Sequence, residues 1–356
     1  MSVASGCVMS ARRGSETELL LEKDEDTVVR MPILVLNAHS RCNCRCVMCD
    51  IWKRQQSTEI RAVDLERHRD SLRRLSVEWV VLSGGEPLMH GDLRGLCAFL
   101  RELGVRLTLL TTGLLLVRRA REVAAWFDDV IVSVDGPPRI HDAIRRVRGS
   151  FDLIRDGVAA VRRIRPEMRI VGRTTVQKAN HSHLQDTVRS AKALGLDGVS
   201  FLAADLTSEA FNRPLPWPGE RQNEVGLSRE EISVLSKEVE ALISGFDDEI
   251  PRGYVAESPD KLRKIVTHFR AQLGDASHES PRCNAPWVSA VIESDGHVRP
   301  CFFHRPLGNI HDSSLEEIVN GQVARRFRHE LKVAEDPICR RCVCSLYRSD
   351  QGVTGE

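Results

Sequence analysis

The sequence has no hydrophobic run long enough to cross a membrane. Its longest uncharged apolar stretch, Leu107 to Val117, has 11 residues and includes three threonines and a glycine, whereas a transmembrane helix needs about 20 apolar residues. The first residues also lack the pattern of a secretory signal, since Arg12 and Arg13 are followed only by Leu19–Leu21 before acidic residues intervene. We therefore expect a cytosolic (cytoplasmic) protein with no membrane partner.

The chain also lacks an excess of charge of either sign. Its 51 Lys and Arg residues nearly cancel its 50 Asp and Glu residues, and no block of like charge is present. A nucleic-acid-binding surface normally needs a basic patch, so we expect no nucleic-acid partner. With 356 residues, 42% hydrophobic and 28% charged, the composition is that of a globular protein with room for two domains.

The eleven cysteines are bunched along the chain. Four lie within residues 42–49 and three within 339–344, preceded by Cys283 and Cys301, while Cys7 and Cys97 stand alone. In a reducing compartment, such bunching indicates metal binding rather than disulfides. Cys97 belongs to an apolar helical stripe, so we expect it in the core.

From residue 31 onward, apolar runs of strand length alternate with segments of helical period. The expected strands are Ile33–Asn37, Trp79–Leu82, Val105–Leu110, Val130–Val134, Ile170–Val176 and Val199–Leu202. Six such units predict an α/β fold with a parallel sheet and right-handed crossovers. Six units are too few to close an eight-stranded barrel, so we expect a partial (β/α)6 TIM-like barrel. Chemistry in such folds lies in the loops after the C-terminal ends of the strands.

Changes in composition predict the division of the chain. Residues 212–226 are rich in proline, glycine and polar groups, and two helical segments follow near 228–244 and 258–273. The expected segments are a flexible N-terminal arm (1–30), the barrel (31–210), a linker and helical segment (211–282) and a small cysteine-rich domain (283–356).

Cys42, Cys46 and Cys49 have a C-x3-C-x2-C spacing in the loop after the first expected strand. Three thiolates on a cubic four-iron cluster leave one iron without a protein ligand, and an open iron can bind a small molecule and pass it an electron. A structural zinc site is the alternative, but zinc prefers four closed ligands, often as two separated C-x2-C pairs. Cys44 lies outside the pattern and is expected to be a spare thiol.

This spacing resembles the signature of the radical S-adenosylmethionine (SAM) enzymes. The resemblance implies that the three cysteines hold a [4Fe-4S] cluster that binds SAM. It also implies that Met48, which stands where the family usually has an aromatic residue, contacts the adenine of SAM. Met is adaptable enough for that contact.

Gly84-Gly85-Glu86-Pro87, after the second expected strand, is similar to the GGEP element of the same family. Two glycines let the backbone approach a ligand closely. Glu86 offers a carboxylate to an ammonium group, and the resemblance implies that this group is the amino group of SAM. Without its position after the cysteine loop, the Gly-Gly-Glu-Pro sequence could equally be a turn with no role in ligand binding.

A polar stretch at the fourth expected strand resembles the SxDG and HDxxR stretches of family members with C-terminal cluster domains. Here it reads Ser133-Val134-Asp135-Gly136 and then His141-Asp142-Ala143-Ile144-Arg145. The resemblance places Ser133 and Asp135 near the ribose and methionyl end of SAM, and a buried polar pair is the alternative. Thr112, after the third strand, and Arg173, in the fifth, are further candidates for lining the same cavity.

The C-terminal unit resembles the SPASM and twitch auxiliary-cluster domains. It reads Cys283-x12-Gly296-x4-Cys301 and then Cys339-x2-Cys342-x-Cys344. The full SPASM pattern has seven cysteines and two clusters, whereas at most five thiols are present here. The resemblance therefore implies one auxiliary [4Fe-4S] cluster, held by Cys283, Cys301, Cys339 and Cys342, with Cys344 as an alternative to Cys342. A zinc ribbon on the same four cysteines is the competing interpretation.

The resemblance implies reductive cleavage of SAM to methionine and a 5′-deoxyadenosyl radical, which abstracts hydrogen from a substrate. A low-potential donor such as flavodoxin or ferredoxin would supply the electron. An auxiliary cluster that accepts an electron from the substrate radical favours net oxidation or rearrangement, here of a sugar-like or aminocyclitol-like small molecule in natural-product biosynthesis.

Several alternatives stay open. Within the class, they are epimerisation, decarboxylation, crosslinking, and modification of a ribosomally made peptide or protein. Only residues 1–30 precede the barrel, which is short for a peptide-grasping domain and favours the small molecule. Outside the class, the alternative is a non-enzymatic zinc or iron–sulfur binding module. Candidate catalytic residues are Cys344, as a hydrogen-atom donor, and Asp205 and Glu209, which follow the sixth strand.

Overall fold

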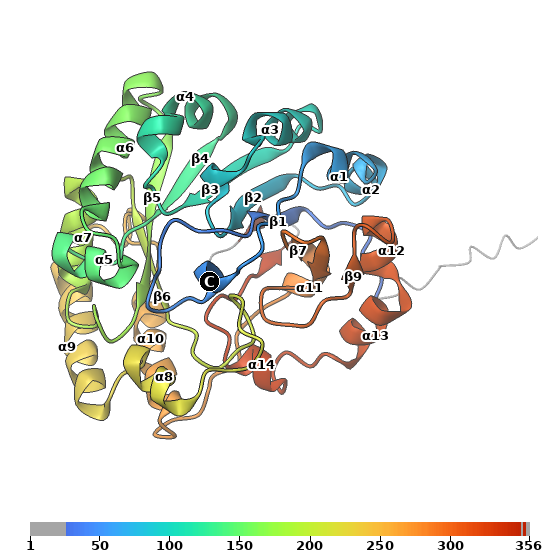
Figure 1. Ribbon diagram of the computed structural model, residues 1–356. Helices are drawn as coiled ribbons and strands as arrows, with labels where there is room; N and C mark the ends of the chain where they lie inside the picture. The colour runs from blue at the N-terminus through green and yellow to red at the C-terminus, as the bar shows by residue number, and fades with distance from the viewer. Residues whose placement is uncertain (1–25, 350–351, 354–356) are drawn as a thin grey trace, which may run out of the picture.

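The computed structural model describes residues 26–349 and 352–353. Its centre is a curved nine-stranded sheet in the order β6-β5-β4-β3-β2-β1-β7-β8-β9, and helices cover the outer face of that sheet (Figure 1). The strands are β1 Ile33–His39, β2 Trp79–Gly84, β3 Arg106–Thr111, β4 Asp129–Ser133, β5 Arg169–Val176, β6 Val199–Ala203, β7 Ser289–Ile292, β8 His297–Arg299 and β9 Gly308–Asn309, with a separate β10 Arg348–Ser349 and β11 Gly352–Val353 hairpin.

Helices lie between the first six strands, and further helices precede β7 and follow β9. They are α1 Ala62–Glu66, α2 Arg69–Arg74, α3 Leu93–Glu102, α4 Leu116–Trp126, α5 Pro138–Arg145, α6 Ser150–Ile164, α7 Leu184–Ala193, α8 Gly219–Val225, α9 Arg229–Gly245, α10 Pro259–Gln272, α11 Ala285–Val288, α12 Leu315–Asn320, α13 Gln322–Glu330 and α14 Pro337–Arg340, with short 3-10 helices η1 Ile51–Lys53 and η2 Pro87–Met89.

Strands β1 to β6 are parallel, and each pairs with the next strand in sequence. The predicted α/β fold with a parallel partial barrel is therefore confirmed. Burial alternates along β5, as expected for a strand of such a sheet. Ile170, Gly172 and Thr174 are buried, whereas Val171 and Arg173 are half-buried. Because successive strand residues point to opposite faces, one face packs against the helices and the other forms the inner face of the barrel.

The C-terminal cysteine-rich segment shares its sheet with the barrel. β7 pairs in parallel with β1, with Val291 opposite Val35, and β8 and β9 follow as antiparallel strands. The buried His68 adds a second link, because its Nε2 lies 2.9 Å from the Ile310 carbonyl oxygen and its Nδ1 accepts a hydrogen bond from Leu315 N at 3.2 Å. The C-terminal cysteines are therefore attached to the open edge of the barrel.

Only residues 26–30 of the segment predicted as a flexible arm are described. Val28 is 5% exposed. Its backbone N–H donates to Asn320 Oδ1 at 2.8 Å, and its carbonyl accepts from Asn320 Nδ2 at 3.0 Å. This part of the segment is bound to the end of α12.

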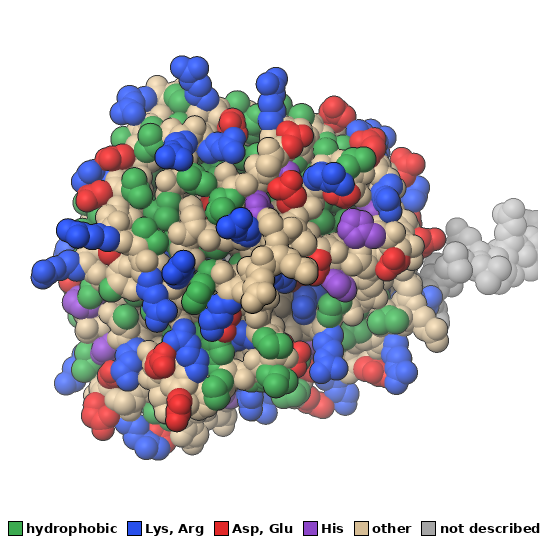
Figure 2. Space-filling view, in the orientation of Figure 1, with side chains coloured by type: hydrophobic (Ala, Val, Ile, Leu, Met, Phe, Trp, Pro, Cys, Tyr) green, Lys and Arg blue, Asp and Glu red, His purple; other side chains and the backbone are tan. Residues whose placement is uncertain are grey.

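Figure 2 shows Lys and Arg side chains intermixed with Asp and Glu on the face seen in Figure 1. That arrangement agrees with the near-zero net charge of the sequence. Within the described residues, no helix is long and apolar enough to span a bilayer.

Candidate active site

The first cysteine loop follows β1 and lies inside the curve of the sheet (Figure 1). Two backbone hydrogen bonds attach it to the C-terminal end of α5: Arg45 N donates to the Arg145 carbonyl at 3.1 Å, and Val47 N donates to the Ile144 carbonyl at 3.0 Å. The last carbonyls of a helix have no partner within the helix. α5 therefore uses them to set the path of the loop.

The four thiols of this loop lie together. Hydrogen bonds to the sulfurs of Cys42 and Cys46 raise the pKa of the buried Cys44 thiol, and the same contact with Cys44 lowers the pKa of Cys46 to about 6. Burial raises the pKa of Cys49 to about 12. Cys44, which lies outside the C-x3-C-x2-C spacing, is thus in direct contact with two of the three cysteines that form it.

A buried ion pair between Arg145 and Asp135 contacts Cys46. Arg145 Nη1 lies 3.5 Å from Cys46 Sγ, and Arg145 Nε donates to Asp135 Oδ2 at 2.6 Å. Asp135 is fully buried and Arg145 is 7% exposed. The Asp135 Oδ1 atom also accepts from Thr175 N at 3.1 Å. The carboxylate that the resemblance assigned to SAM binding is therefore engaged by a cation and a strand amide.

The rest of the HDxxR stretch also has structural contacts. His141 Nδ1 accepts a hydrogen bond from Asp135 N at 3.2 Å. Asp142 accepts from Gly149 N, Ser150 Oγ and Phe151 N, at the start of α6. The motif thus orients the strand end that carries Asp135 and caps the next helix. Ser133 is half-buried at the end of β4.

The Gly84-Gly85-Glu86-Pro87 loop packs directly against the first residues of the cysteine loop. Gly85 N donates to the His39 carbonyl and Glu86 N donates to the Arg41 carbonyl, both at 2.8 Å. A Cβ atom at Gly85 would lie 2.1 Å from the Arg41 carbonyl oxygen, and Gly84 has a φ of +119°. The two glycines are needed for the contact between the two loops, in addition to any contact with a ligand.

Replacing Gly85 with alanine is expected to push the two loops apart. The clash is with backbone, so we expect the free energy of unfolding to fall by about 1–3 kcal/mol and the iron content of the first cluster to fall with it. Gly219→Ala is the matched control, because nothing lies within 4 Å of the added Cβ there. Anaerobic denaturant unfolding and iron analysis measure both effects. Equal stability and iron for the two variants would contradict the close approach.

Glu86 is fully buried and accepts four hydrogen bonds. Its Oε1 accepts from Leu88 N at 3.0 Å and Thr111 Oγ1 at 2.8 Å, and its Oε2 accepts from Thr112 N and Thr112 Oγ1, both at 2.7 Å. A carboxylate offers about four lone-pair positions. Burial raises the pKa of Glu86, and these hydrogen bonds oppose that shift. Glu86 therefore joins the end of β2 to the end of β3.

Residues after β6 cover the cysteine loop. Trp217 Nε1 donates to Asp50 Oδ2 at 2.7 Å, and Met48 packs against a small apolar cluster that includes Trp217 and Leu206. The predicted catalytic candidate Asp205 forms a buried ion pair with Arg213 at 2.9 Å, so its carboxylate is engaged in holding this cover. Glu209, a second of the three catalytic candidates, is more exposed and lies 3.8 Å from Arg305.

Five cysteines of the C-terminal segment form a second group. They are Cys283 before α11, Cys301 after β8, Cys339 in α14, and Cys342 and Cys344 after it. The pKa of the Cys342 thiol is raised by burial and by the charges of Cys344, Cys301 and Cys283. Cys344 is exposed to solvent, but desolvation by the atoms around its sulfur raises the pKa of its thiol, and the nearby charge of Arg173 opposes that shift. The second group therefore approaches the inner face of the barrel at β5.

Arg173 also interacts with Glu257, an acidic residue that no sequence motif marks. Glu257 Oε2 accepts from Phe201 N at 2.8 Å, on β6. Burial raises the pKa of Glu257 to about 7, although the charge of Arg173 opposes the shift. Glu257 lies just before Ser258, the N-cap of α10, so the only available signal was its place at a helix start.

The raised pKa of Glu257 predicts a pH effect on stability. Between pH 4.5, its ordinary pKa, and about 7, the folded chain keeps a proton that the unfolded chain releases. The contribution of this proton to the free energy of unfolding is complete below this range. It is lost as the pH rises through the range, by no more than about 1.4 kcal/mol per pH unit. Anaerobic unfolding at several pH values should show a flatter profile for Glu257→Gln. The exposed Glu220→Gln is the control, and identical slopes for all three proteins would refute the effect.

Comparison with known proteins decides the family. Residues 36–191 match the family model described as "Radical SAM superfamily", and residues 283–343 match SPASM, described as "Iron-sulfur cluster-binding domain". An AdoMet-dependent heme synthase of Methanosarcina barkeri is 31% identical over 314 residues, covering 82% of this chain and 83% of that protein. The chain belongs to the radical SAM superfamily. Radical SAM proteins with a SPASM domain bind SAM and [4Fe-4S] clusters, which favours iron–sulfur clusters over zinc at the two cysteine groups.

Other relatives of this radical SAM enzyme differ in what they act on. The Fe-coproporphyrin III synthase of M. barkeri is 26% identical over 304 residues, covering 81% of this chain and 73% of its own length. Among solved structures, Streptococcus suis SuiB bound to S-adenosylmethionine has a TM-score of 0.61 at 15% identity, covering 90% of this chain and 74% of SuiB. Native anSMEcpe with bound AdoMet and Kp18Cys peptide has a TM-score of 0.60 at 20% identity, covering 83% and 82%. At these identities, the structures show the shared fold.

The side chains at the site fit such cofactors. The first loop supplies several thiol sulfurs, which are the ligands that iron–sulfur clusters take. Among the described residues, Asn43 Nδ2, Arg173 Nε and His141 Nε2 are buried atoms with no hydrogen-bond partner. Buried polar atoms are normally hydrogen-bonded, so these atoms are available to a polar ligand. Asn43, one residue after Cys42, was missed in reasoning from the sequence.

Proposed function

We propose that this enzyme cleaves SAM reductively and oxidises a small molecule by one two-electron step. Cys42, Cys46 and Cys49 would hold the SAM-binding cluster. Cys283, Cys301, Cys339 and Cys342 would hold the auxiliary cluster, leaving the Cys344 thiol near Arg173. The pairing of β7 with β1 carries the proposal, because it attaches the segment with the second cysteine group to the strand that leads into the first cysteine loop.

Atoms and electrons balance in this reaction. One electron cleaves the S–C5′ bond of SAM to give methionine and the 5′-deoxyadenosyl radical, which takes a hydrogen atom from a substrate carbon to give 5′-deoxyadenosine. The substrate radical would then lose a proton to solvent and one electron, and an auxiliary cluster held by the second cysteine group would supply the acceptor for that electron. A low-potential donor such as flavodoxin or ferredoxin supplies the first electron.

The protein residues bind, orient and exclude water. Glu86 and Thr112 keep the ends of β2 and β3 in contact, so that, together with Gly84, Gly85 and Pro87, they would present a rigid wall to the methionyl end of SAM. Met48 and the cover around Trp217 shield the cysteine loop from solvent. Ser133, Asp135 and Arg173 complete the expected cofactor-binding set on the inner face, with Asp135 acting through Arg145.

We propose a carboxylate-bearing small molecule as the substrate, instead of the sugar or aminocyclitol expected from the sequence. Arg173 supports this choice, because its half-buried guanidinium has an unpartnered Nε and guanidinium groups bind carboxylates well. Two relatives are named as an AdoMet-dependent heme synthase and an Fe-coproporphyrin III synthase, and coproporphyrin carries carboxylate side chains.

Modification of a peptide is the second candidate. It is favoured by two structural neighbours that were solved with peptides bound: SuiB with the precursor peptide SuiA and anSMEcpe with Kp18Cys peptide. A chain of this fold can therefore bind a peptide.

Anaerobic purification followed by reaction with dithionite and SAM tests the proposal. We expect about eight irons per chain, from two four-iron clusters, and formation of 5′-deoxyadenosine. Zinc in place of iron, or no 5′-deoxyadenosine, would support the non-enzymatic binding module instead. Candidate carboxylates and candidate peptides, each deuterated at carbon, are then compared for transfer of deuterium into 5′-deoxyadenosine. Transfer only from peptides would replace the small-molecule proposal.

A further inference from the structure

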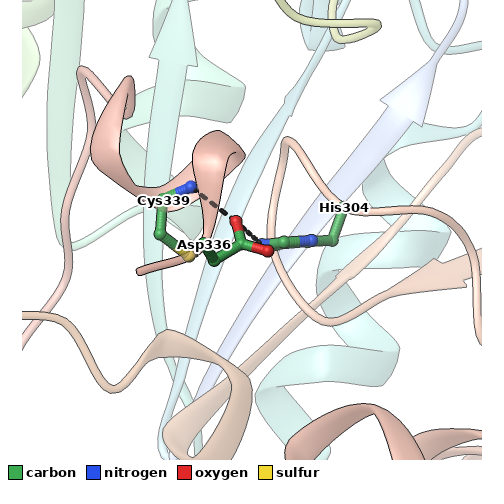
Figure 3. Close-up of side chains that lie close together, drawn as sticks. All are labelled: His304, Asp336 and Cys339. Atoms are coloured by element: carbon green, nitrogen blue, oxygen red, sulfur yellow. Dashed lines mark hydrogen bonds and ion pairs between the residues drawn. The ribbon is translucent and has the colours of Figure 1, made fainter. Parts of the chain in front are cut away.

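His304 lies against one of the C-terminal cysteines. Its Nε2 is 3.4 Å from Cys339 Sγ and 3.8 Å from Asp336 Oδ1, and Figure 3 shows the ring pointing at both groups. The three side chains are close enough together to be grouped around a common centre, with ligand atoms within 4.8 Å of one another. His304 follows β8, while the other two residues belong to the start of α14.

The position of the ring is fixed from several sides. His304 is 6% exposed, and its ring packs edge-on against Phe327 of α13 with the centroids 4.9 Å apart. Its carbonyl accepts from Arg299 Nη1 at 2.9 Å. A buried imidazole held on these sides has little freedom to leave the sulfur.

The neighbours of Nε2 determine which ring nitrogen carries the proton. Both nearby groups are acceptors: the sulfur of Cys339 and the carboxylate of Asp336. Asp336 Oδ1 in turn accepts from Ile338 N at 2.9 Å and Cys339 N at 2.8 Å, which fixes the backbone of Cys339. The tautomer with hydrogen on Nε2 is therefore the one that this site favours.

We propose that His304 donates a hydrogen bond to the Cys339 sulfur and thereby raises the reduction potential of the auxiliary cluster. A donor on a ligand sulfur withdraws electron density and stabilises the extra negative charge of the reduced cluster, and hydrogen bonds to sulfur are among the factors that set such potentials. This role rests on the proposed function, since an acceptor cluster must be reducible by the substrate radical. His304 is a positioning and tuning residue, and it touches no substrate in this proposal.

An EPR-monitored redox titration of the holoenzyme, with neither SAM nor substrate present, tests the role of His304. His304→Phe keeps a ring against Phe327 but removes the donor, so we expect the auxiliary cluster to titrate at a more negative potential with its iron retained. His304→Gln keeps an N–H donor, so its auxiliary cluster should titrate close to the potential of the unmodified enzyme. His297→Gln, on the exposed part of β8, is the control and should leave the potential unchanged.

Two results would overturn the proposal. The first is an unchanged auxiliary potential in His304→Phe. The second is loss of the auxiliary cluster in both His304 variants, which would make His304 an iron ligand. The 5′-deoxyadenosine yield without substrate is measured in the same preparations. Absence of that product in the unmodified enzyme would reject the proposed function separately, because the potential is read without turnover.

Discussion

Replacement of Cys46 with alanine is expected to abolish SAM cleavage and to leave about half of the iron. Cys46 is the most buried of the three patterned cysteines, at 6% exposed, and Arg145 contacts its sulfur. Two remaining thiolates would not hold a four-iron cluster that already has an open iron. The C-terminal cluster is held by other segments and should remain. Iron and sulfide analysis together with 5′-deoxyadenosine formation measure both effects.

Cys44→Ala is the matched control for this variant, because it removes a buried thiol from the same loop without breaking the C-x3-C-x2-C spacing. It should keep all of the iron and most of the cleavage activity. Cleavage retained in Cys46→Ala and lost in Cys44→Ala would show that the ligand assignment in this loop is wrong.

Arg145→Met is expected to produce the largest loss of stability. It leaves Asp135, which is fully buried, as an unpaired carboxylate beneath the cysteine loop. Breaking one side of a buried ion pair typically costs about 3–5 kcal/mol. The variant should also lose part of the first cluster, since Arg145 contacts Cys46. Anaerobic denaturant unfolding of holoenzyme, with iron analysis, measures the two effects together.

The double variant Asp135→Asn/Arg145→Met separates charge from packing. The asparagine side chain would carry no charge and could still accept from Thr175 N, so we expect the double variant to recover a large part of the lost stability. Arg326→Met, which breaks an exposed pair with Glu330 on α13, should change stability little, because exposed ion pairs contribute little. A double variant no more stable than Arg145→Met would show that the loss comes from packing alone.

Much of the barrel could be predicted because its signals are local. The alternation of buried and half-buried residues along β5 is a property of consecutive residues, and the helical stripe of α6 repeats within one helix. The predicted helix at 228–244 begins as α9 after Ser228, whose side chain and Glu231 form a capping box. Even the C-x3-C-x2-C spacing is contained in one loop.

Other features depend on residues far apart in the chain. The sequence predicts a small cysteine-rich domain at 283–356, and in the structure β7 of that segment extends the barrel sheet through β1. Strand pairing over that separation depends on which strand edge the folded barrel leaves open, and no short stretch of sequence encodes it. For the same reason, the partners of Asp135, Asp205 and Glu257 could not be identified in advance.

The sequence by itself determined which ligand types and which fold this protein has. The cysteine groups and the glycine-rich loop indicate the ligands, and the repeating strand and helix periods indicate the fold. Only the tertiary structure decided how those parts serve one another. In the structure, Arg145 contacts Cys46, His304 contacts Cys339, and the charge of Arg173 acts on Cys344 of the second cysteine group. The physical reason is that ligand type and periodicity are properties of short segments, whereas burial and ion pairing exist only after distant segments have packed together.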